Sequence, residues 1–220
     1  MRLPTRERRT LRDQVVWQAA SLLLAYPDHL HSQRLDTVAE LLSHLTGPAR
    51  DPLARCYRGL RELDPRPAAE DYVATFDLAK RTTMYLTYWT DGATRNRGAH
   101  MHEFTAVYRS AGVEPPKTES PDHLPVVLEF AAIVDPRAGR RLLVEHRMAI
   151  EVLLEALTER RSCYADAVAA VCATLPAVTD QETRRARRLA EDGPPAEAVG
   201  LQPFTLTVPP RRPGRMEGAG

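Results

Sequence analysis

Hydrophobic residues recur every three or four positions along most of the chain, which is the period of an amphipathic α-helix. The first such stretch runs from Val15 to Tyr26 and predicts a core helix. Similar stripes predict helices from Leu35 to Leu45, from Asp51 to Leu63 and from Arg95 to Tyr108, and the clearest stripe runs from Leu142 to Leu157. No alternating strand pattern of any length occurs. We therefore predict an all-α fold, a single helical-bundle domain.

Composition along the chain predicts where this domain begins and ends. Residues 1–11 precede the first hydrophobic stripe and are expected to be flexible, whereas residues 12–178 are expected to form the helical domain. Residues 179–192 are highly charged and almost without apolar side chains, so any helix there is marginal. Residues 193–220 are rich in proline and glycine and show no periodicity. Because such a segment buries too little apolar surface to offset its ordering entropy, we predict a disordered tail.

Most aromatic residues lie in one segment, Asp71 to Thr90. Their spacing predicts one helix, or two helices joined near Thr82 and Thr83, that present a broad aromatic wall. Tyr72 and Phe76 are more typical of a core than of a contact surface. Two interpretations remain open for the other aromatic residues, because tyrosine and tryptophan occur both in cores and where a partner docks. These residues are Tyr85, Tyr88 and Trp89.

Arg95 and Arg97 lie near the start of the helix that follows this aromatic segment. A positive charge is unfavourable at a helix N-terminus because of the helix dipole. We therefore expect these arginines to pair with a carboxylate, such as that of Asp91 or Asp77.

The stretch from Glu119 to Ala132 leads from a polar, proline-bearing loop directly into an apolar run. Asp122 and His123 stand side by side where the chain turns into the predicted helix, and Pro125 follows in the first turn, where its missing N–H costs little. One interpretation is an ordinary helix start with Ser120 or Asp122 as N-cap. The other is a functional site. Taken alone, the residues favour the ordinary helix start, because the capping signature is common among helices.

Composition and charge exclude several classes of protein. The 220 residues are 43% hydrophobic, enough for one sizeable core, and 30 Lys and Arg nearly balance 29 Asp and Glu. The net charge of +1 gives no global field to attract nucleic acid or an anionic membrane. Three widely spaced cysteines favour neither a disulfide framework nor a zinc site. No apolar run approaches the length that crosses a bilayer, so we predict a soluble protein of the reducing cytoplasm without membrane insertion.

Motifs of catalysis are missing from the sequence. It contains no glycine-rich phosphate loop, no nucleophile elbow and no zinc-protease motif. His100 and His102 lie two apart on a predicted helix and point in different directions, so they do not share a metal ion. We predict no catalytic residue, no cofactor and no metal. One alternative is a nucleic-acid-binding regulator that uses the basic run from Arg184 to Arg188, although flanking acidic residues favour a solvated face.

Several motifs together resemble a known family. These are L-L-A-Y-P (Leu23–Pro27), Y-V-A-T-F-D (Tyr72–Asp77) with Y-L-T-Y (Tyr85–Tyr88), T-R-N-R-G (Thr94–Gly98) and P-D-H-L-P-V-V-L-E-F-A-A (Pro121–Ala132). The chain resembles the NarJ family of nitrate reductase molybdenum cofactor assembly chaperones, within the wider TorD/DmsD-like group. The similarity covers about residues 12 to 175, and it does not extend to the arginine run or to the tail.

This resemblance implies a TorD-like helical bundle and a cytoplasmic chaperone that catalyses no reaction. Family members bind the N-terminal region of the nitrate reductase catalytic subunit until molybdenum cofactor is inserted, and they are absent from the mature enzyme. The wider group carries a Glu-x-x-Asp-His signature at a hinge beside the peptide-binding region. Glu119, Asp122 and His123 match it, and Ser120 replaces the proline often found after the glutamate.

We therefore predict a peptide-binding groove at this hinge, because a groove for an amphipathic helix needs apolar walls and charged groups at its rim. Asp122 and His123 are expected either to shape the groove or to meet a basic or polar group of the client. Eight residues make up the predicted client-binding site. They are Tyr85, Tyr88, Trp89, Glu119, Asp122, His123, Leu124 and Pro125.

Overall fold

The structure, a computed structural model, describes residues 5–92 and 95–177 and isolated positions between 179 and 193. The predicted tail, apart from Gly193, lies outside the described residues, as do Arg185 and Arg187 of the basic run. Within the described residues the all-α prediction is confirmed, because no strand occurs and the one β-type contact is an isolated antiparallel bridge between Tyr85 and His123.

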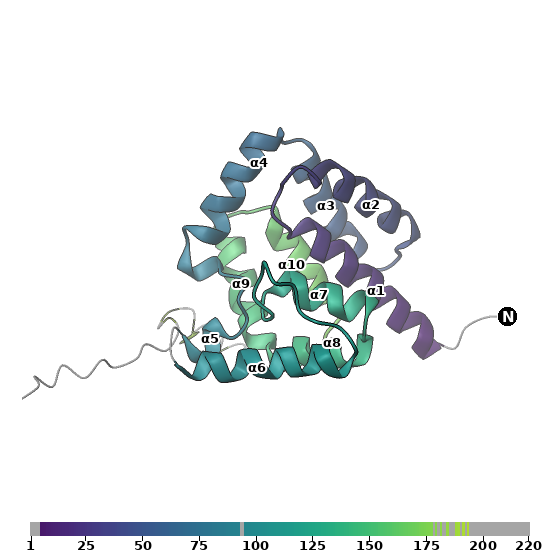
Figure 1. The fold of residues 1–220 in the computed structure, drawn as a ribbon. Helices are drawn as coiled ribbons and strands as arrows, with labels where there is room; N and C mark the ends of the chain where they lie inside the picture. Colours follow the sequence, from purple (N-terminus) through teal and green to yellow (C-terminus); the bar gives the residue numbers. More distant parts are fainter. Residues whose placement is uncertain are drawn as a thin grey trace, which may run out of the picture.

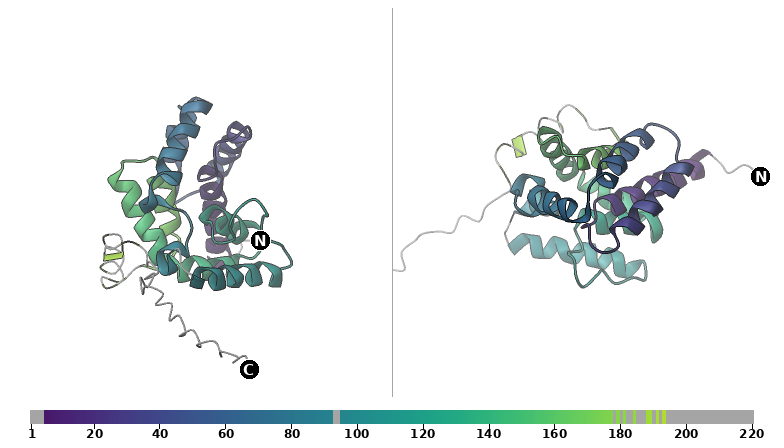
Figure 2. Two further views of the ribbon diagram at one scale, coloured as in Figure 1. Left: turned by 60° about the vertical axis from the view of Figure 1, so that its left-hand side comes forward. Right: turned by 90° about the horizontal axis from the view of Figure 1, so that it is seen from above.

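Figure 1 shows the helices in their chain order, and Figure 2 gives two further views. The views agree that α6 lies across one end of the bundle and that α2, α3 and α4 lie toward the other. The elements are α1 (Thr5–Leu23), α2 (His31–His44), α3 (Arg50–Arg61), α4 (Pro65–Tyr72), the π-helical turn η1 (Val73–Asp77), the 3-10 turn η2 (Lys80–Thr82), α5 (Tyr88–Asp91), α6 (Arg95–Ser110), α7 (Leu124–Ile133), α8 (Pro136–Glu145), α9 (Arg147–Glu159) and α10 (Tyr164–Cys172).

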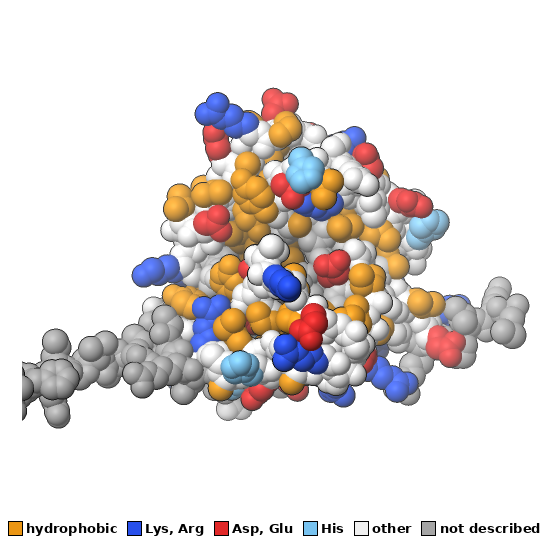
Figure 3. All heavy atoms as spheres, in the orientation of Figure 1, with side chains coloured by type: hydrophobic (Ala, Val, Ile, Leu, Met, Phe, Trp, Pro, Cys, Tyr) orange, Lys and Arg blue, Asp and Glu red, His pale blue; other side chains and the backbone are white. Residues whose placement is uncertain are grey.

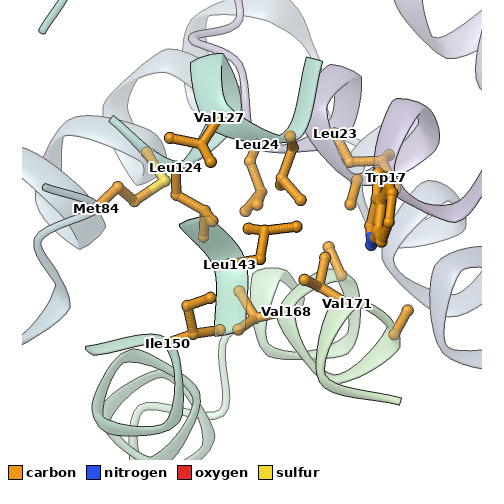
Figure 4. Packing of buried hydrophobic residues seen from close by; sticks show 14 of the residues in the cluster. Trp17, Leu23, Leu24, Met84, Leu124, Val127, Leu143, Ile150, Val168 and Val171 are labelled. Atoms are coloured by element: carbon orange, nitrogen blue, oxygen red, sulfur yellow. The ribbon is translucent and has the colours of Figure 1, made fainter. Parts of the chain in front are cut away.

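The hydrophobic core lies between α1, α7, α8, α9 and α10, whose apolar side chains meet in Figure 4. The predicted stripe of the first helix is confirmed, since Val16, Ala19, Ala20, Leu23 and Leu24 are all buried. α1 begins at Thr5 and so extends into the segment for which the sequence predicts flexibility. α1 packs along α7, and α7 packs along α8. The core therefore holds α7, the helix that follows the Asp122–His123 pair, on two sides.

One glycine sets the distance between α7 and α8. A Cβ atom added to Gly139 would lie 2.3 Å from the Cβ atom of Ala131, far inside van der Waals contact. Any other residue at this position would push the two helices apart. The close packing of α8 thus fixes where α7 lies and, with it, the loop that precedes α7.

The clearest hydrophobic stripe of the sequence belongs to two helices. α8 ends at Glu145 and α9 begins at Arg147, and His146 between them leaves helical geometry with φ −99° and ψ 20°. The His146 ring packs on Phe104 of α6, with ring centres 4.9 Å apart. The stripe continues across the break because both helices bury their apolar faces in the same core.

The aromatic segment forms neither of the predicted arrangements. Instead of one helix or two helices joined near Thr82 and Thr83, α4 ends at Tyr72 and is followed by the short turns η1 and η2. Residues 83–87, which we call the extended segment and whose last two residues form a turn, then lead to α5. Backbone hydrogen bonds to a distant loop replace helical ones: the Leu86 amide donates to the Asp122 carbonyl at 3.1 Å, and the Leu124 amide donates to the Met84 carbonyl at 2.9 Å. Pairing with the α7 loop therefore overrides local helix preference.

The predicted cap of α7 is also wrong. His123 occupies the N-cap position, and no side chain there accepts a hydrogen bond from the first turn. Pro125 does lie in the first turn, as predicted. Neither Ser120 nor Asp122 caps the helix, because the Asp122 side chain points across to α5 and bonds Thr87.

Candidate functional site

A cavity of about 230 Å³ opens where the end of α4, the extended segment and the loop before α7 meet. We call it the aromatic cavity. The face of the molecule seen in Figure 3 carries hydrophobic side chains over α4 and in the region between α4 and α6. The cavity is lined by Tyr26, Tyr72, Phe76, Asp77, Thr83, Met84, Tyr85, Glu119 and His123.

Behind the cavity, the Asp122 carboxylate is fully buried and satisfied by its neighbours. Its Oδ2 accepts hydrogen bonds from the Thr87 amide at 3.1 Å and from the Thr87 hydroxyl at 2.5 Å, and its Oδ1 accepts one from the Ser120 hydroxyl. The Arg97 guanidinium lies 3.7 Å from Oδ2. A buried carboxylate is tolerated only with such partners, so Asp122 joins the α7 loop to α5 and α6. We call this set of residues the Asp122 clamp: Thr87, Arg97, Ser120 and Asp122.

Arg97 therefore pairs with a different carboxylate from those that the sequence predicts. Its Nε also donates to the Thr87 hydroxyl at 3.2 Å, and its guanidinium lies 5.2 Å from the centre of the Tyr85 ring. Asp91 bonds the Nδ1 of His100 at 2.6 Å instead, and this hydrogen bond raises the pKa of His100. The carboxylate that meets Arg97 lies 25 residues away in sequence, beyond the reach of a local argument.

Glu119, His123 and Tyr85 form a small polar cluster on the wall of the aromatic cavity. The Tyr85 hydroxyl donates to Glu119 Oε1 at 3.3 Å, and His123 Nδ1 lies 3.5 Å from Glu119 Oε2. The rings of Tyr85 and His123 pack with centres 5.1 Å apart. Burial lowers the pKa of His123, and the nearby carboxylates oppose this only in part. His123 is therefore neutral at pH 7, and the cavity wall carries negative charge.

The structure brings three of the eight predicted site residues to the cavity wall, namely Tyr85, Glu119 and His123. Asp122 lies behind them. The other four do not line the cavity: Trp89, Leu124 and Pro125 are buried, and the half-buried Tyr88 packs against Trp89 with ring centres 6.0 Å apart. A role in client binding stays a prediction for all eight.

Four residues that line the cavity were not predicted as site residues from the sequence, and two others were assigned to the core. The four are Tyr26, Asp77, Thr83 and Met84. Tyr26 is 47% exposed at the rim of the cavity, and Asp77 ends the π-helical turn beside it. Tyr72 and Phe76 are buried as expected, yet both line the cavity. Tyr26 and Asp77 each lie within a motif that carries the family resemblance, which was the available signal.

Two negative findings apply to the described residues alone. No group of three or more His, Cys, Asp or Glu side chains there is placed to hold a metal ion. No helix in that part of the chain has both the length and the hydropathy needed to cross a membrane.

Comparison with known proteins gives matches over most of the chain. The family model described as nitrate reductase delta subunit matches residues 25–170. The probable nitrate reductase molybdenum cofactor assembly chaperone NarJ of Bacillus subtilis is 30% identical over 171 residues, which cover 77% of this chain and 93% of the relative. NarJ of Escherichia coli is 30% identical over 148 residues, covering 66% of this chain and 63% of the relative.

The chain shares a higher identity with one region of a longer protein. The nitrate reductase-like protein NarX of Mycobacterium tuberculosis is 58% identical over 160 residues, which cover 73% of this chain. The matched region is 24% of NarX, so the chain spans about a quarter of the length of that relative. The expectation drawn from the sequence motifs is confirmed: the chain belongs to the nitrate reductase delta subunit family.

Proposed function

We propose that this protein is a cytoplasmic chaperone for the assembly of nitrate reductase, with no reaction of its own. In this proposal it binds the N-terminal region of the apo catalytic subunit transiently and holds it while molybdenum cofactor is inserted. It is then released and is not part of the mature enzyme. The names of the two NarJ relatives, which describe assembly chaperones, support this proposal.

The aromatic cavity is the observation that carries the proposal. Its aromatic walls suit a side chain of an amphipathic peptide, and its carboxylates can meet a polar group of the same peptide. Its wall is built on a rigid frame, because the backbone bonds of Leu86 and Leu124 join the extended segment to the α7 loop. Rigid walls lower the entropy lost on binding.

The Asp122 clamp supports one of the two roles considered for Asp122. Because its carboxylate is fully buried and already accepts three hydrogen bonds, Asp122 has no free acceptor facing the cavity. We infer that Asp122 shapes the binding site, whereas Glu119 and His123 are the members of the signature that a client contacts.

The test is binding of the client by the full chain. Calorimetry with a synthetic peptide of the catalytic subunit's N-terminal region should give a saturable complex, and the chain should co-purify with the apo catalytic subunit but not with the mature enzyme. Tyr85→Ala should weaken peptide binding about tenfold through the loss of aromatic contact area. Tyr57→Ala, a change at a partly buried tyrosine of α3 outside the cavity, is the control. Absence of binding by the wild-type chain would reject the proposal.

A further inference from the structure

We propose that the aromatic cavity is a subsite for a single basic side chain, arginine or lysine, of the bound polypeptide. This inference rests on the proposed function and specifies the chemistry of the client at one position. It follows from the charge of the cavity, from its aromatic walls and from its size.

The cavity is lined by two carboxylates and by no arginine or lysine. The Asp77 side chain is exposed and makes no hydrogen bond or ion pair with any described residue. Glu119 accepts bonds through Oε1 from the Tyr85 hydroxyl and from the Ser120 amide, while Oε2 faces the neutral His123 at 3.5 Å. Neither carboxylate therefore has a cationic partner in the part of the chain that the structure describes.

Two arginines that contact residues of the cavity have acceptors elsewhere. Arg97 pairs with the buried Asp122 and bonds the Thr87 hydroxyl. Arg34 pairs with Asp28 and donates to the Tyr26 carbonyl at 2.6 Å. Since both guanidinium groups already have acceptors, neither of them neutralises the negative charge of the cavity within the described residues, and a cation of a bound polypeptide can do so.

The aromatic side chains that line the cavity also favour a cation, in addition to its carboxylates. The Tyr26 and Tyr72 rings meet edge to face with centres 5.3 Å apart, and Tyr72 packs on Phe76 at 4.8 Å. A guanidinium or ammonium group held among such rings gains from their negative faces, and it gains more when it is partly desolvated. The contact of Arg97 with the Tyr85 ring at 5.2 Å is a pairing of this type within the same site.

The volume fits one side chain. At about 230 Å³ the cavity is smaller than the roughly 300 Å³ at which pockets for whole small molecules begin. An anionic side chain would face two carboxylates at close range, and an apolar one would desolvate them without giving them a partner. Leu78, which is 78% exposed beside Asp77, offers an apolar contact at the rim. The segment that fits thus carries a basic residue next to apolar ones.

The experiment is a double-mutant cycle between the full chain and the N-terminal peptide of the catalytic subunit, measured by calorimetry at low and high salt. Asp77→Asn and Glu119→Gln remove charge while keeping an acceptor oxygen, so Glu119→Gln can still bond Tyr85 and Ser120. Each is expected to weaken binding about fivefold, and the two together about twentyfold. The double variant should also lose most of the salt dependence. Asp71→Asn, an exposed carboxylate on α4 outside the cavity, is the matched control.

The peptide supplies the other half of the cycle, with each arginine and lysine replaced in turn by glutamine. One of these replacements should weaken binding by the wild-type chain. With that peptide, Asp77→Asn should cause no further loss of affinity. The proposal is overturned if the wild-type chain binds the peptide but the Asp77 and Glu119 variants bind it within twofold of wild type, or if no basic residue couples to them. No binding by the wild-type chain at all would instead reject the proposed function, and this inference with it.

Discussion

Two acidic residues near the aromatic cavity, Asp122 and Asp77, differ in burial and in the partners of their carboxylates. Asp122 is fully buried, and its carboxylate is surrounded by the Thr87 amide, two hydroxyl groups and a guanidinium. The Asp77 side chain is exposed at the end of η1, and no described residue bonds it. Desolvation is large for the first carboxylate and small for the second. The first therefore contributes to the fold, whereas the second keeps its charge available for a partner.

This difference shows which acidic residues around the cavity can take part in recognition. A buried carboxylate must be satisfied internally, because an unpaired charge in the interior costs several kcal/mol. Its lone pairs are then no longer available to a ligand. An exposed carboxylate costs the fold nothing, and a ligand that brings a cation gains from it. Four predictions test this difference.

Replacing Asp122 should have the largest effect. We expect Asp122→Ala to lower the free energy of unfolding by about 3–5 kcal/mol, because it leaves the Thr87 amide without an acceptor and Arg97 without its carboxylate. Urea denaturation followed by circular dichroism measures this change. Asp122→Asn keeps an acceptor oxygen and should cost less than Asp122→Ala. A loss below about 1 kcal/mol for the alanine variant would show that the Asp122 clamp contributes little to stability.

Replacing the hydroxyl that joins two members of the clamp should come next. The Thr87 hydroxyl donates to Asp122 and accepts from Arg97. We expect Thr87→Val to lower the free energy of unfolding by about 2 kcal/mol, since the shape is kept and the bonds are lost. The control is Thr37→Val on the exposed face of α2, where the hydroxyl bonds only a local carbonyl. Equal effects at the two positions would contradict the prediction.

Acidification should destabilise the protein through its buried histidines. Burial lowers the pKa of His31, His123 and His146 from the ordinary value of 6.5, so the unfolded chain takes up protons first as the pH falls. Their stabilising contribution is present above pH 6.5 and is lost as the pH falls below that value. His100, with its raised pKa, acts in the opposite direction. We expect a net loss of about 1 kcal/mol in the free energy of unfolding between about pH 7.5 and about pH 5.5.

The histidine prediction is checked by urea denaturation at the two pH values. His146→Phe keeps a ring against Phe104 and removes the titrating group, so it should reduce the pH dependence. His29→Gln, at an exposed histidine, is the control and should leave the pH dependence unchanged. Greater stability of the wild-type chain at the lower pH would contradict the prediction that the buried histidines destabilise the protein on acidification.

The smallest effect is expected at Asp77. Asp77→Asn should change the free energy of unfolding by less than about 0.5 kcal/mol, because the exposed carboxylate bonds no described residue. Thermal and urea denaturation measure this directly. If Asp77→Asn weakens peptide binding and leaves the stability unchanged, the Asp77 carboxylate serves binding and not the fold. A clear loss of stability would mean that its carboxylate has a structural partner.

Local pattern was enough for much of the fold. The apolar stripe that contains Val16 and Leu23 predicts α1, and the run after Pro125 predicts α7, because a 3.6-residue period depends only on the order of residues along one helix. Three members of the candidate site, Tyr85, Glu119 and His123, were likewise found in sequence and do meet in space. The family itself follows from motifs and is confirmed by the comparisons.

What only the tertiary structure decided is the use of each polar group. The sequence predicts Asp122 as a helix cap, but its carboxylate instead bonds Thr87 and pairs with Arg97. The sequence predicts Asp77 as a partner for an arginine, but its carboxylate lines the cavity without a described partner. The sequence by itself determined the core stripes of most helices and the family, since these depend on local periodicity and motif, but not the course of the aromatic segment or the break at His146. The acceptor that a donor finds depends on which distant segments the packing of α7 against α1 and α8 brings together. Long-range contacts of this kind leave no periodic trace in the chain.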